Sequence, residues 1–384
     1  MKGESLYLKL MFLDCGYQAI STSSIADPEI LSTVVYLYRE SPWNKTCYAT
    51  VNNDGKDVID LWGGYADTEL TRSWNKDTIV TIISMTKNVL ILAMLIFVDR
   101  GVLSITDKVS KFWPEFAANG KENVEIHRIL SHTSGVSGWE SDRSLSPPWW
   151  KPGTASGYHS WTFGHLLAAV VRQVTGSTLQ EFIIEEIVEP LGADFQFGVS
   201  ESDLPRTANI IATAMPPLGP GMGPQPGSIG ARSMNPLPVP LDFGNGSAWR
   251  QGNILSGSGH SNARAMNRIL SIISLGGSVG GKRLLSQKTL EIIFEEQSNG
   301  IDHVIGAPLR FGVGFGLTVD SGPVTYLPKG HVCFWGGLGG SLALMDLDRK
   351  QTITYVMNNM TMTGLGNDVV RSYVKEIYEV LGVP

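Results

Sequence analysis

One run of ten residues, Ile79 to Asn88, constrains this chain more than any other part of it. Five apolar or β-branched residues, Ile79 to Ile83, precede Ser84, and Lys87 opens a long apolar segment. On a helix, residues i and i+3 are neighbours on one face, so the Lys87 amine can reach the Ser84 hydroxyl. A serine is a poor nucleophile until a base takes its proton, and a desolvated lysine is such a base. The run predicts a strand that delivers a serine nucleophile to a buried helix.

The Ser-x-x-Lys spacing by itself does not identify the site, because it also occurs at 73–76 and 372–375. The first of these lies in a polar stretch without a helix signal. The second lies in an expected amphipathic helix, where serine and lysine on the wet face need no further explanation. Only Ser84 stands between an apolar strand and an apolar helix, so the context selects Ser84.

Composition excludes several classes of protein. The 384 residues are 42% hydrophobic and 17% charged, which is typical of a globular chain with one large core or two subdomains. The net charge of −6, without a basic cluster, gives no reason to expect a nucleic-acid partner. The apolar run Val89 to Val98 is too short to span a bilayer, which takes about 20 residues. Three scattered cysteines indicate a reducing compartment, so we expect a cytoplasmic protein.

Periodicity and turn signals predict strands toward both ends of the chain and helices between them. An Asp-Gly hairpin turn joins the first two strands, and Gly101 is placed to end the long helix as a left-handed cap. This order predicts an α+β layer interrupted by a helical insertion. The expected helices are 27–40, 84–100, 163–176, 179–191, 263–275, 286–297 and 368–381, and the expected strands are 47–51, 58–63, 312–319, 340–347 and 352–358.

The same pattern suggests how the chain divides. Residues 1–26 would form an N-terminal extension, and residues 27–83 with 240–384 would form the sheet domain. Residues 84–239 would form a mainly helical domain, whose Pro- and Gly-rich part, 215–240, reads as a surface loop. Loops of this kind often border a site.

Two further stretches carry chemistry. Pro152 to Ser160 contains Tyr158, and a tyrosine close to a lysine is predicted to titrate below its usual pKa of about 10 and to share in proton transfer. Trp335 to Ser341 is rich in glycine, and such an edge lets backbone N–H groups approach a developing oxyanion.

In this order the motifs resemble those of the serine β-lactamase and penicillin-binding-protein superfamily. The likeness is strongest to the class C branch and its esterase relatives, the family VIII carboxylesterases. It extends from Asp27 to the C-terminus, and the flanking stretches 130–135, 152–154 and 259–264 agree with it. The motifs are Ser84-x-x-Lys87, Tyr158-x-Ser160 and Trp335-Gly336-Gly337.

The resemblance implies an antiparallel sheet flanked by helices, with an inserted mainly helical domain. It also implies that Ser84 is the acylated nucleophile and that Lys87 and Tyr158 share the acid and base work. The backbone N–H groups of Ser84 and Leu338 would form the oxyanion hole. No cofactor is implied, and the seven histidines lack metal-ligand spacing, so no metal is expected. Substrate contacts would come from Trp335, Gly336, Gly337, Ser160 and His159.

The chain departs from its β-lactamase relatives at three points. Trp335 stands where a lysine is usual, which replaces a cation for a substrate carboxylate with an apolar wall. Ser160 stands where an asparagine is usual. Both changes disfavour β-lactam turnover and favour a neutral ester. The stretch 139–149 is shorter than expected, which would widen the site or reflect a lost exon.

Some of these residues also have ordinary structural readings. Tyr158 can be a packing residue, His132 is expected to hold a loop by hydrogen bonds, and His159 can be either a pocket or a solvated residue. The Gly-x-Ser-x-Gly pattern at 276–280 lacks the strand-turn-helix setting of a nucleophile elbow and is read as a hairpin loop.

The sequence favours a serine hydrolase that forms an acyl-enzyme on a small-molecule substrate, an esterase for small or medium acyl esters. The alternatives are an acyltransferase similar to the fungal lovastatin acyltransferase, a weak β-lactamase, and a binding protein without catalysis. Acyl transfer would use the aromatic surroundings of Trp149, Trp150 and Trp161 to hold a bulky acceptor alcohol. The oligomeric state is not indicated.

Overall fold

The computed structural model describes residues 18–19, 46–139, 146–212, 225–234, 241–361 and 363–380. Four predicted features lie wholly or largely outside these residues: the N-terminal extension, the helix at 27–40, the centre of the short stretch 139–149 and most of the loop 215–240.

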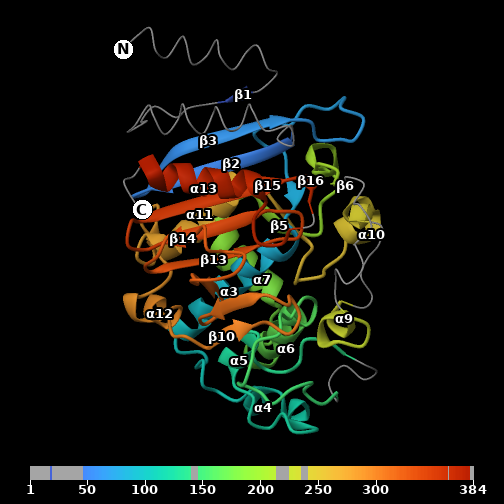
Figure 1. Cartoon of the computed structure of the whole chain (residues 1–384), viewed down its shortest axis with the longest axis vertical. Coiled ribbons are helices and arrows are strands. Elements are labelled where there is room, and N and C mark those ends of the chain that lie inside the picture. Colours follow the sequence, from blue (N-terminus) through green and yellow to red (C-terminus); the bar gives the residue numbers. More distant parts are fainter. Residues whose placement is uncertain are drawn as a thin grey trace.

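A nine-stranded sheet organises the molecule (Figure 1). Every neighbouring pair of its strands is antiparallel. Strand β2 pairs along its length with β15, so segments from opposite ends of the chain lie side by side. In order across the sheet, the strands are β1 (Gln18–Ala19), β3 (Lys56–Gly64), β2 (Thr46–Asn53), β15 (Gln351–Met357), β14 (Leu342–Asp346), β13 (Val332–Gly336), β12 (Gly316–Leu317), β11 (Pro308–Phe311) and β10 (Ser298–Ile301).

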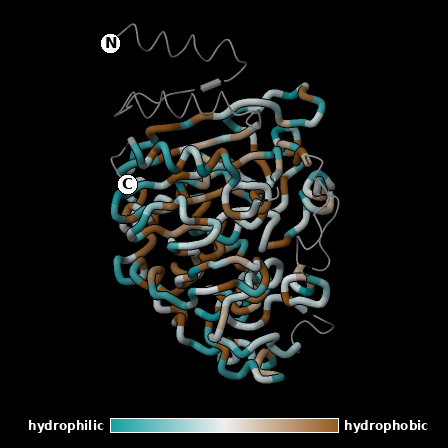
Figure 2. The backbone as a smooth tube through the Cα atoms, viewed as in Figure 1, coloured by the Kyte–Doolittle hydropathy of each residue, from teal (hydrophilic) through white to brown (hydrophobic). Residues whose placement is uncertain are grey.

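Both faces of the sheet are covered. Along β14, Leu342 and Leu344 join one hydrophobic cluster, and Ala343 and Met345 join the other, because successive side chains point to opposite faces. Helix α13 (Asp368–Val380) packs in the first cluster, whereas α3 (Lys87–Asp99) and α11 (Ala263–Ser274) pack in the second. The apolar residues accordingly gather in the interior of the molecule (Figure 2).

Helix α3 is the central element of the core. Every residue from Lys87 to Phe97 is buried, as expected for a helix that is apolar all round. It ends as predicted at Gly101, whose φ is +68° and whose N–H donates to Val98 O at 3.0 Å. None of the helices in the described part of the chain is long and apolar enough to cross a membrane.

The remaining helices cluster mainly below the sheet in the view of Figure 1. The predicted helix at 179–191 is made of two α-helical segments joined by a π-helical turn at 184–188. The helices are α4 (Val109–Phe112), α5 (Ile126–Leu130), α6 (Thr162–Thr175), α7 (Leu179–Ile183), α8 (Glu189–Leu191), α9 (Ile229–Ser233), α10 (Ser247–Arg250) and α12 (Gln287–Ile292).

The structure corrects three predicted elements. The α-helix expected from Ser84 begins at Lys87, and Ser84 lies in a preceding 3-10 turn, Ile83–Thr86. The strand expected at 312–319 is reduced to β12, because Gly314 has a φ of +96° in the turn that precedes it. The helix expected at 286–297 ends at Ile292, and the chain then forms β10.

A small antiparallel sheet delivers Ser84 to its position. It consists of β4 (Val80–Thr81), β7 (Gly259–Ser261) and β5 (Phe195–Phe197), with β7 in the middle. Beyond β4, Ile82 N–H donates to Gly259 O at 2.9 Å, which extends the pairing to the residue before the 3-10 turn.

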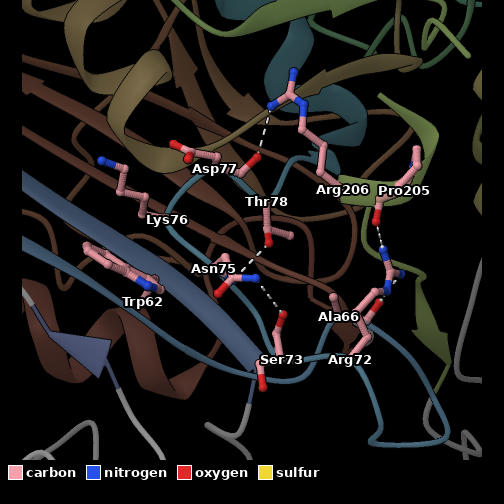
Figure 3. A pocket seen from close by; sticks show the side chains of 10 residues that line it. All are labelled: Trp62, Ala66, Arg72, Ser73, Asn75, Lys76, Asp77, Thr78, Pro205 and Arg206. Atoms are coloured by element: carbon pink, nitrogen blue, oxygen red, sulfur yellow. Dashed lines mark hydrogen bonds between the residues drawn. The ribbon is translucent and has the colours of Figure 1, made fainter. Parts of the chain in front are cut away.

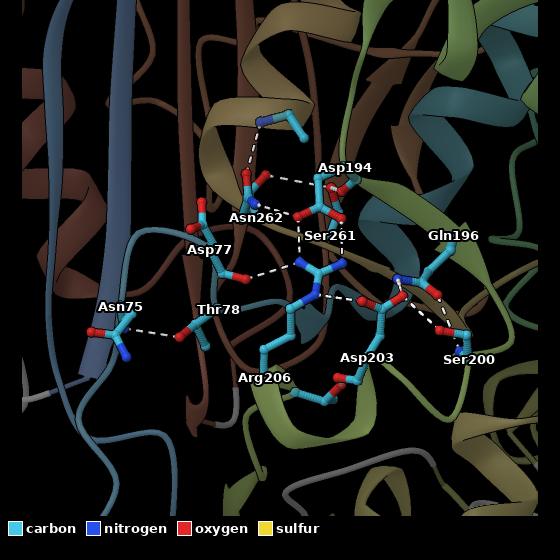
Figure 4. Close-up of polar contacts among 12 residues, drawn as sticks. Asn75, Asp77, Thr78, Asp194, Gln196, Ser200, Asp203, Arg206, Ser261 and Asn262 are labelled. Atoms are coloured by element: carbon cyan, nitrogen blue, oxygen red, sulfur yellow. Dashed lines mark hydrogen bonds and ion pairs between the residues drawn. The ribbon is translucent and has the colours of Figure 1, made fainter.

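Arg206 ties the segment before β4 to the rest of the small sheet (Figure 4). Its guanidinium donates to both carboxylate oxygens of Asp194 and, at 2.6 Å, to Asp203. It also donates to the backbone oxygen of Asp77 at 2.9 Å, three residues before β4. One side chain therefore links the strand that carries the chain toward Ser84 to the loop beside β5.

We expect Arg206→Leu to lower the free energy of unfolding by about 1–2 kcal/mol, because two carboxylates lose their shared cation and a carbonyl loses its donor. The effect is modest because water screens this ion pair, whose Arg206 and Asp194 side chains are 30% and 33% exposed. Urea denaturation measures the change. The matched control is Lys111→Leu, which removes a surface pair with Asp107 and should change the stability by less than about 0.5 kcal/mol. Equal effects of the two variants would contradict this role of Arg206.

Candidate active site

Ser84 lies on a strained turn. Ile83, immediately before it, has a φ of +47°, a conformation that is a genuine outlier for a β-branched residue. Ser84 is in the first turn of the 3-10 helix, so its backbone N–H has no acceptor within that helix. The turn is held from the other side by Thr86, whose hydroxyl oxygen accepts from Gly259 N–H at 3.2 Å. The serine is therefore presented half-buried, with an N–H group available beside its hydroxyl.

Lys87 is the buried partner of Ser84. Its Nζ atom lies 3.2 Å from Ser84 Oγ, 3.0 Å from Ser160 O and 2.8 Å from Ser256 O. The residue is only 1% exposed, and burial lowers the pKa of its amine well below the usual 10.5. A neutral amine has two N–H donors and one lone pair. When the amine is neutral, the two carbonyls can take both of its N–H donors, which leaves the lone pair for the Ser84 hydroxyl.

The carbonyl of Ser256 is a contact that sequence reasoning missed. Any residue type supplies a backbone oxygen, so the sequence contains no signal for it. The Ser256 hydroxyl supports the same loop, because it accepts from Gly164 N–H at 2.8 Å and donates to Trp161 O at 2.7 Å. The loop is thereby fixed to the start of α6.

Tyr158 lies beside the Ser84–Lys87 pair. Lys87 Nζ is 4.9 Å from the centre of the phenol ring, and the Ser84 hydroxyl acts to lower the pKa of the phenol. The prediction that this tyrosine titrates below its usual pKa is wrong. Burial raises the pKa of Tyr158 above 10, so the phenol is protonated at neutral pH.

Asp302 holds the backbone of Tyr158 in place. One of its carboxylate oxygens accepts from the N–H groups of Tyr158, Val304 and Ile305 at 3.1, 2.9 and 2.9 Å. Asp302 is fully buried and is 144 residues away from Tyr158 in the chain. No local pattern in the sequence marks it as part of this region.

His159 and His132 lie behind the site. His159 is fully buried. Its Nδ1 atom lies 2.8 Å from Gly157 O, so this nitrogen carries the proton. Its Nε2 atom accepts from the Ser134 hydroxyl at 2.6 Å. Burial lowers the pKa of His159 to about 4. His132 Nδ1 accepts from the backbone N–H of His159 at 3.2 Å, which agrees with the loop-holding role predicted for His132. The structure gives both rings supporting positions and leaves His159 no surface for a substrate.

Ser160 contributes in two ways. Its carbonyl binds Lys87, as described above, and its hydroxyl is buried without a hydrogen-bond partner among the described residues. A buried hydroxyl without a partner is costly, so this oxygen is suited to a polar group of a bound molecule.

The glycine-rich loop between β13 and β14 lies against the turn that carries Ser84. A Cβ atom on Gly337 would come within 2.6 Å of Ile82 O, so only glycine fits this contact. The N–H groups of Gly337 and Gly339 donate to Ser341 O and Thr363 O, each at 3.0 Å. No described residue accepts from the N–H of Leu338 between them. The two N–H groups expected to form an oxyanion hole are thus both unengaged.

Trp335 is more than the apolar wall that the sequence indicates. It is 3% exposed, and its ring packs 5.0 Å from the Tyr158 ring and 5.2 Å from the Phe311 ring. Its indole Nε1–H donates to the Tyr158 hydroxyl oxygen at 3.3 Å. The sequence contains no signal for this hydrogen bond, because it depends on the register of β13 relative to the loop of Tyr158.

Aromatic residues surround the turn on its outer side. Ile83 and Trp249 belong to one apolar cluster, against which Trp161, Phe243 and Leu338 pack. Trp249 is fixed by its indole N–H, which donates to Thr81 Oγ1 at 3.0 Å. We call Ile83, Trp161, Phe243, Trp249 and Leu338 together the aromatic cluster. The two other tryptophans considered from the sequence pack elsewhere: Trp149 stacks on Arg232 and Trp150 lies against His303.

The other two Ser-x-x-Lys spacings and the Gly-x-Ser-x-Gly pattern each lie in a definite part of the fold. Ser73, Asn75 and Lys76 line a pocket of about 520 Å³ next to the Arg206 network, and Figure 3 shows the Lys76 side chain directed away from Ser73. Ser372 donates to Asp368 O on α13, and Lys375 pairs with Glu379. Residues 276–280 belong to a hairpin of β8 (Ser278–Val279) and β9 (Lys282–Arg283), as predicted.

Comparisons with known proteins agree with this geometry. The family profile described as Beta-lactamase matches residues 39–372. Over 333 residues the chain is 29% identical to the esterase/beta-lactamase LipL of Mycobacterium tuberculosis, which covers 80% of this chain and 75% of that protein. The crystal structure of a family VIII carboxylesterase superposes with a TM-score of 0.82 at 26% identity, over 94% of this chain and 99% of that one.

A second solved structure, EstA from Arthrobacter nitroguajacolicus Rue61a, gives a TM-score of 0.80 at 27% identity, over 96% of this chain and 100% of that one. The resemblance stated from the motifs and the predicted α+β fold are both confirmed. This chain belongs to the beta-lactamase family.

Proposed function

We propose that the protein is a serine ester hydrolase that forms an acyl-enzyme on Ser84. The observation that carries the proposal is the position of Lys87, a buried amine 3.2 Å from Ser84 Oγ with its pKa lowered by burial. Two carbonyls accept from this amine, so in its neutral form the lone pair is left for the serine. A nucleophile and a pre-oriented base form the minimum apparatus for acyl transfer.

The residues divide the proton transfers as follows. Ser84 Oγ attacks the ester carbonyl as its proton passes to the neutral Lys87 amine, and the N–H groups of Ser84 and Leu338 bind the oxyanion. Tyr158, which is protonated, then donates its proton to the departing alkoxide, and the proton held by Lys87 restores the phenol. In the second half of the reaction, water attacks the acyl-enzyme, the proton donors and acceptors exchange roles, and the acid is released.

The substrate we propose is a neutral ester with a small or medium apolar acyl group. Trp335 offers no cation to a substrate carboxylate, and the aromatic cluster beside Ser84 is suited to apolar groups. The unpartnered Ser160 hydroxyl is available to one polar atom of the substrate. The names of the relatives, an esterase/beta-lactamase and a family VIII carboxylesterase, point to the same class.

We expect the value of kcat/KM for p-nitrophenyl butyrate to exceed that for the β-lactam nitrocefin by roughly 100-fold. The reason is that nitrocefin carries a carboxylate, to which Trp335 offers no cation. Parallel assays of the two chromogenic substrates on one preparation measure the ratio. The result that contradicts the ester assignment is turnover of nitrocefin as fast as that of the ester.

Acyl transfer to an alcohol would use the same acyl-enzyme, and the aromatic cluster gives it a specific basis because an apolar alcohol can pack there. Product partitioning separates it from hydrolysis. With p-nitrophenyl butyrate and increasing 1-butanol, hydrolysis alone releases p-nitrophenol and butyric acid in equal amounts. A growing share of butyl butyrate would favour the transferase assignment.

A further inference from the structure

One pocket has no part in the proposed reaction. It has a volume of about 520 Å³, which is within the range of cavities that hold small organic molecules (Figure 3). Its walls come from β3, from the loop that connects β3 to β4 and from the 3-10 turn Leu204–Arg206. None of the described lining residues is one that we assign to the ester reaction. A molecule bound here would therefore leave the Ser84 site open.

Arg72 gives this pocket a fixed positive charge. Its guanidinium donates to the carbonyls of Pro205 at 2.5 Å, Thr207 at 2.9 Å and Ala66 at 3.1 Å. Among the described residues, no carboxylate forms an ion pair with it. A guanidinium has five N–H donors, so the Nε–H and one Nη1–H of Arg72 are still available. The three carbonyls hold the cation in place without neutralising it.

Asp67, an acidic residue of the same loop, does not bind this guanidinium. Its carboxylate accepts from the backbone N–H groups of Thr71 and Arg72, each at 2.9 Å, and from the Thr71 hydroxyl at 2.8 Å. The charge of Arg72 still acts on another cation, because burial, and after it the charge of Arg72, lowers the pKa of Arg250. The region around Arg72 is therefore unfavourable for a further cation and favourable for an anion.

Lys76 brings a second positive charge to the pocket. Its side chain is exposed, and no described carboxylate forms an ion pair with it. The third cation of the lining, Arg206, is already paired with two aspartates. Arg72 and Lys76 outnumber Asp77, the one acid among the described lining residues. Two cations less one acid leave a net charge of +1, which matches an anion with a single charge.

The indole of Trp62 provides a neutral donor in the same lining. Trp62 is 2% exposed, and its Nε1–H has no hydrogen-bond partner among the described residues. A buried donor without a partner is costly, and an acceptor atom of a bound molecule would remove that cost. The Trp62 ring, Ala66 and Pro205 also supply apolar surface to the lining. The pocket thus combines positive charge and a free N–H group with apolar walls.

We propose that this pocket is a second binding site, which takes an organic monocarboxylate through the positive charges of Arg72 and Lys76 and the free N–H group of Trp62. The apolar body of the ligand contacts Ala66 and Pro205. Inorganic phosphate lacks such a body, and an alcohol lacks the charge, so neither uses the whole pocket. Ester hydrolysis releases a molecule of this class, but the binding site itself does not depend on the proposed function.

The test is isothermal titration of hexanoate into the full-length protein at low ionic strength, after treatment with a fluorophosphonate to cover the Ser84 site. We expect one equivalent to bind with a millimolar dissociation constant, and the affinity to fall as salt is added. Inorganic phosphate and 1-hexanol, titrated in the same way, should each bind at least about fivefold more weakly than hexanoate.

Two pairs of variants place the ligand in the pocket. Lys76→Met should weaken hexanoate binding by about threefold or more, whereas Lys108→Met, which alters an exposed lysine outside the pocket, should not change it. Trp62→Phe should weaken binding to a similar extent because it removes the N–H group. Its control is Trp74→Phe, which alters another buried tryptophan without a partner among the described residues, but one outside the lining.

The lysine variants change exposed side chains, so they decide the question even where a tryptophan variant fails to fold. The proposal is overturned if hexanoate does not bind the wild type at about 50 mM, or if Lys76→Met binds it as tightly as Lys108→Met does. Equal affinity for phosphate or for 1-hexanol would overturn the assignment to a monocarboxylate. Failure of the fluorophosphonate to label Ser84 would instead contradict the proposed function, while the variants would still test this pocket.

Discussion

Replacing Ser84 with alanine is expected to reduce ester turnover by more than about 10⁴-fold, to the level of the uncatalysed background. The Oγ atom lies 3.2 Å from the buried Lys87 amine, and its loss removes the atom that we propose to carry the acyl group. The measurement is p-nitrophenyl butyrate hydrolysis by the purified wild-type and variant proteins.

Two matched controls come from the chain itself. Ser73→Ala and Ser372→Ala remove the serines of the other two Ser-x-x-Lys spacings, which the structure places outside the site, and both should keep wild-type activity. Activity retained in Ser84→Ala, or lost in either control, would show that the context argument selected the wrong serine.

Replacing Lys87 with methionine is expected to lower kcat/KM by about 10³-fold or more, because the base that accepts the Ser84 proton is removed while the chain length is nearly kept. In the wild type, kcat/KM should rise with pH as the ammonium becomes a neutral amine, through a pKa well below the usual 10.5. The variant should lack this rise. A pH profile of both proteins from acid to alkaline conditions measures the difference, and a shared profile would exclude Lys87 as the base.

The lowered pKa of Lys87 also makes the stability of the fold depend on pH. Because the folded-state pKa of Lys87 lies below its unfolded value, the unfolded chain binds more protons between the two values. The free energy of unfolding therefore rises with pH in this window, and as the pH drops it falls until the folded-state pKa is passed, below which it levels off. The contribution is absent from Lys87→Met, so urea denaturation of the two proteins should show a steeper pH dependence for the wild type.

The parts of the site that the sequence could predict are local. The spacing of Ser84 and Lys87 requires only helical geometry, and the hairpin turn at Asp54-Gly55 requires only a backbone with positive φ, which both residues have. The end of α3 at Gly101 is of the same kind. Each depends on neighbours within a few residues, which is the range that sequence patterns describe.

The parts that could not be predicted depend on long-range packing. Lys87 is oriented by the carbonyl of Ser256, 169 residues away, and a backbone oxygen leaves no mark in the sequence. The raised pKa of Tyr158 is a burial effect, which outweighs the neighbouring groups that the sequence does identify. Strand β13 is absent from the predicted strands, and its position is set by its pairing with β12 and β14, which are close to it only in the folded sheet.

Covalent trapping tests the central claim most directly. The wild-type protein is treated with a fluorophosphonate, digested, and its peptides are sequenced by mass spectrometry. Our account predicts one phosphonyl group per chain, on Ser84, with no labelling of Ser84→Ala and slow labelling of Lys87→Met. Labelling at another residue, or full ester turnover by protein that carries the phosphonyl group on Ser84, would contradict it.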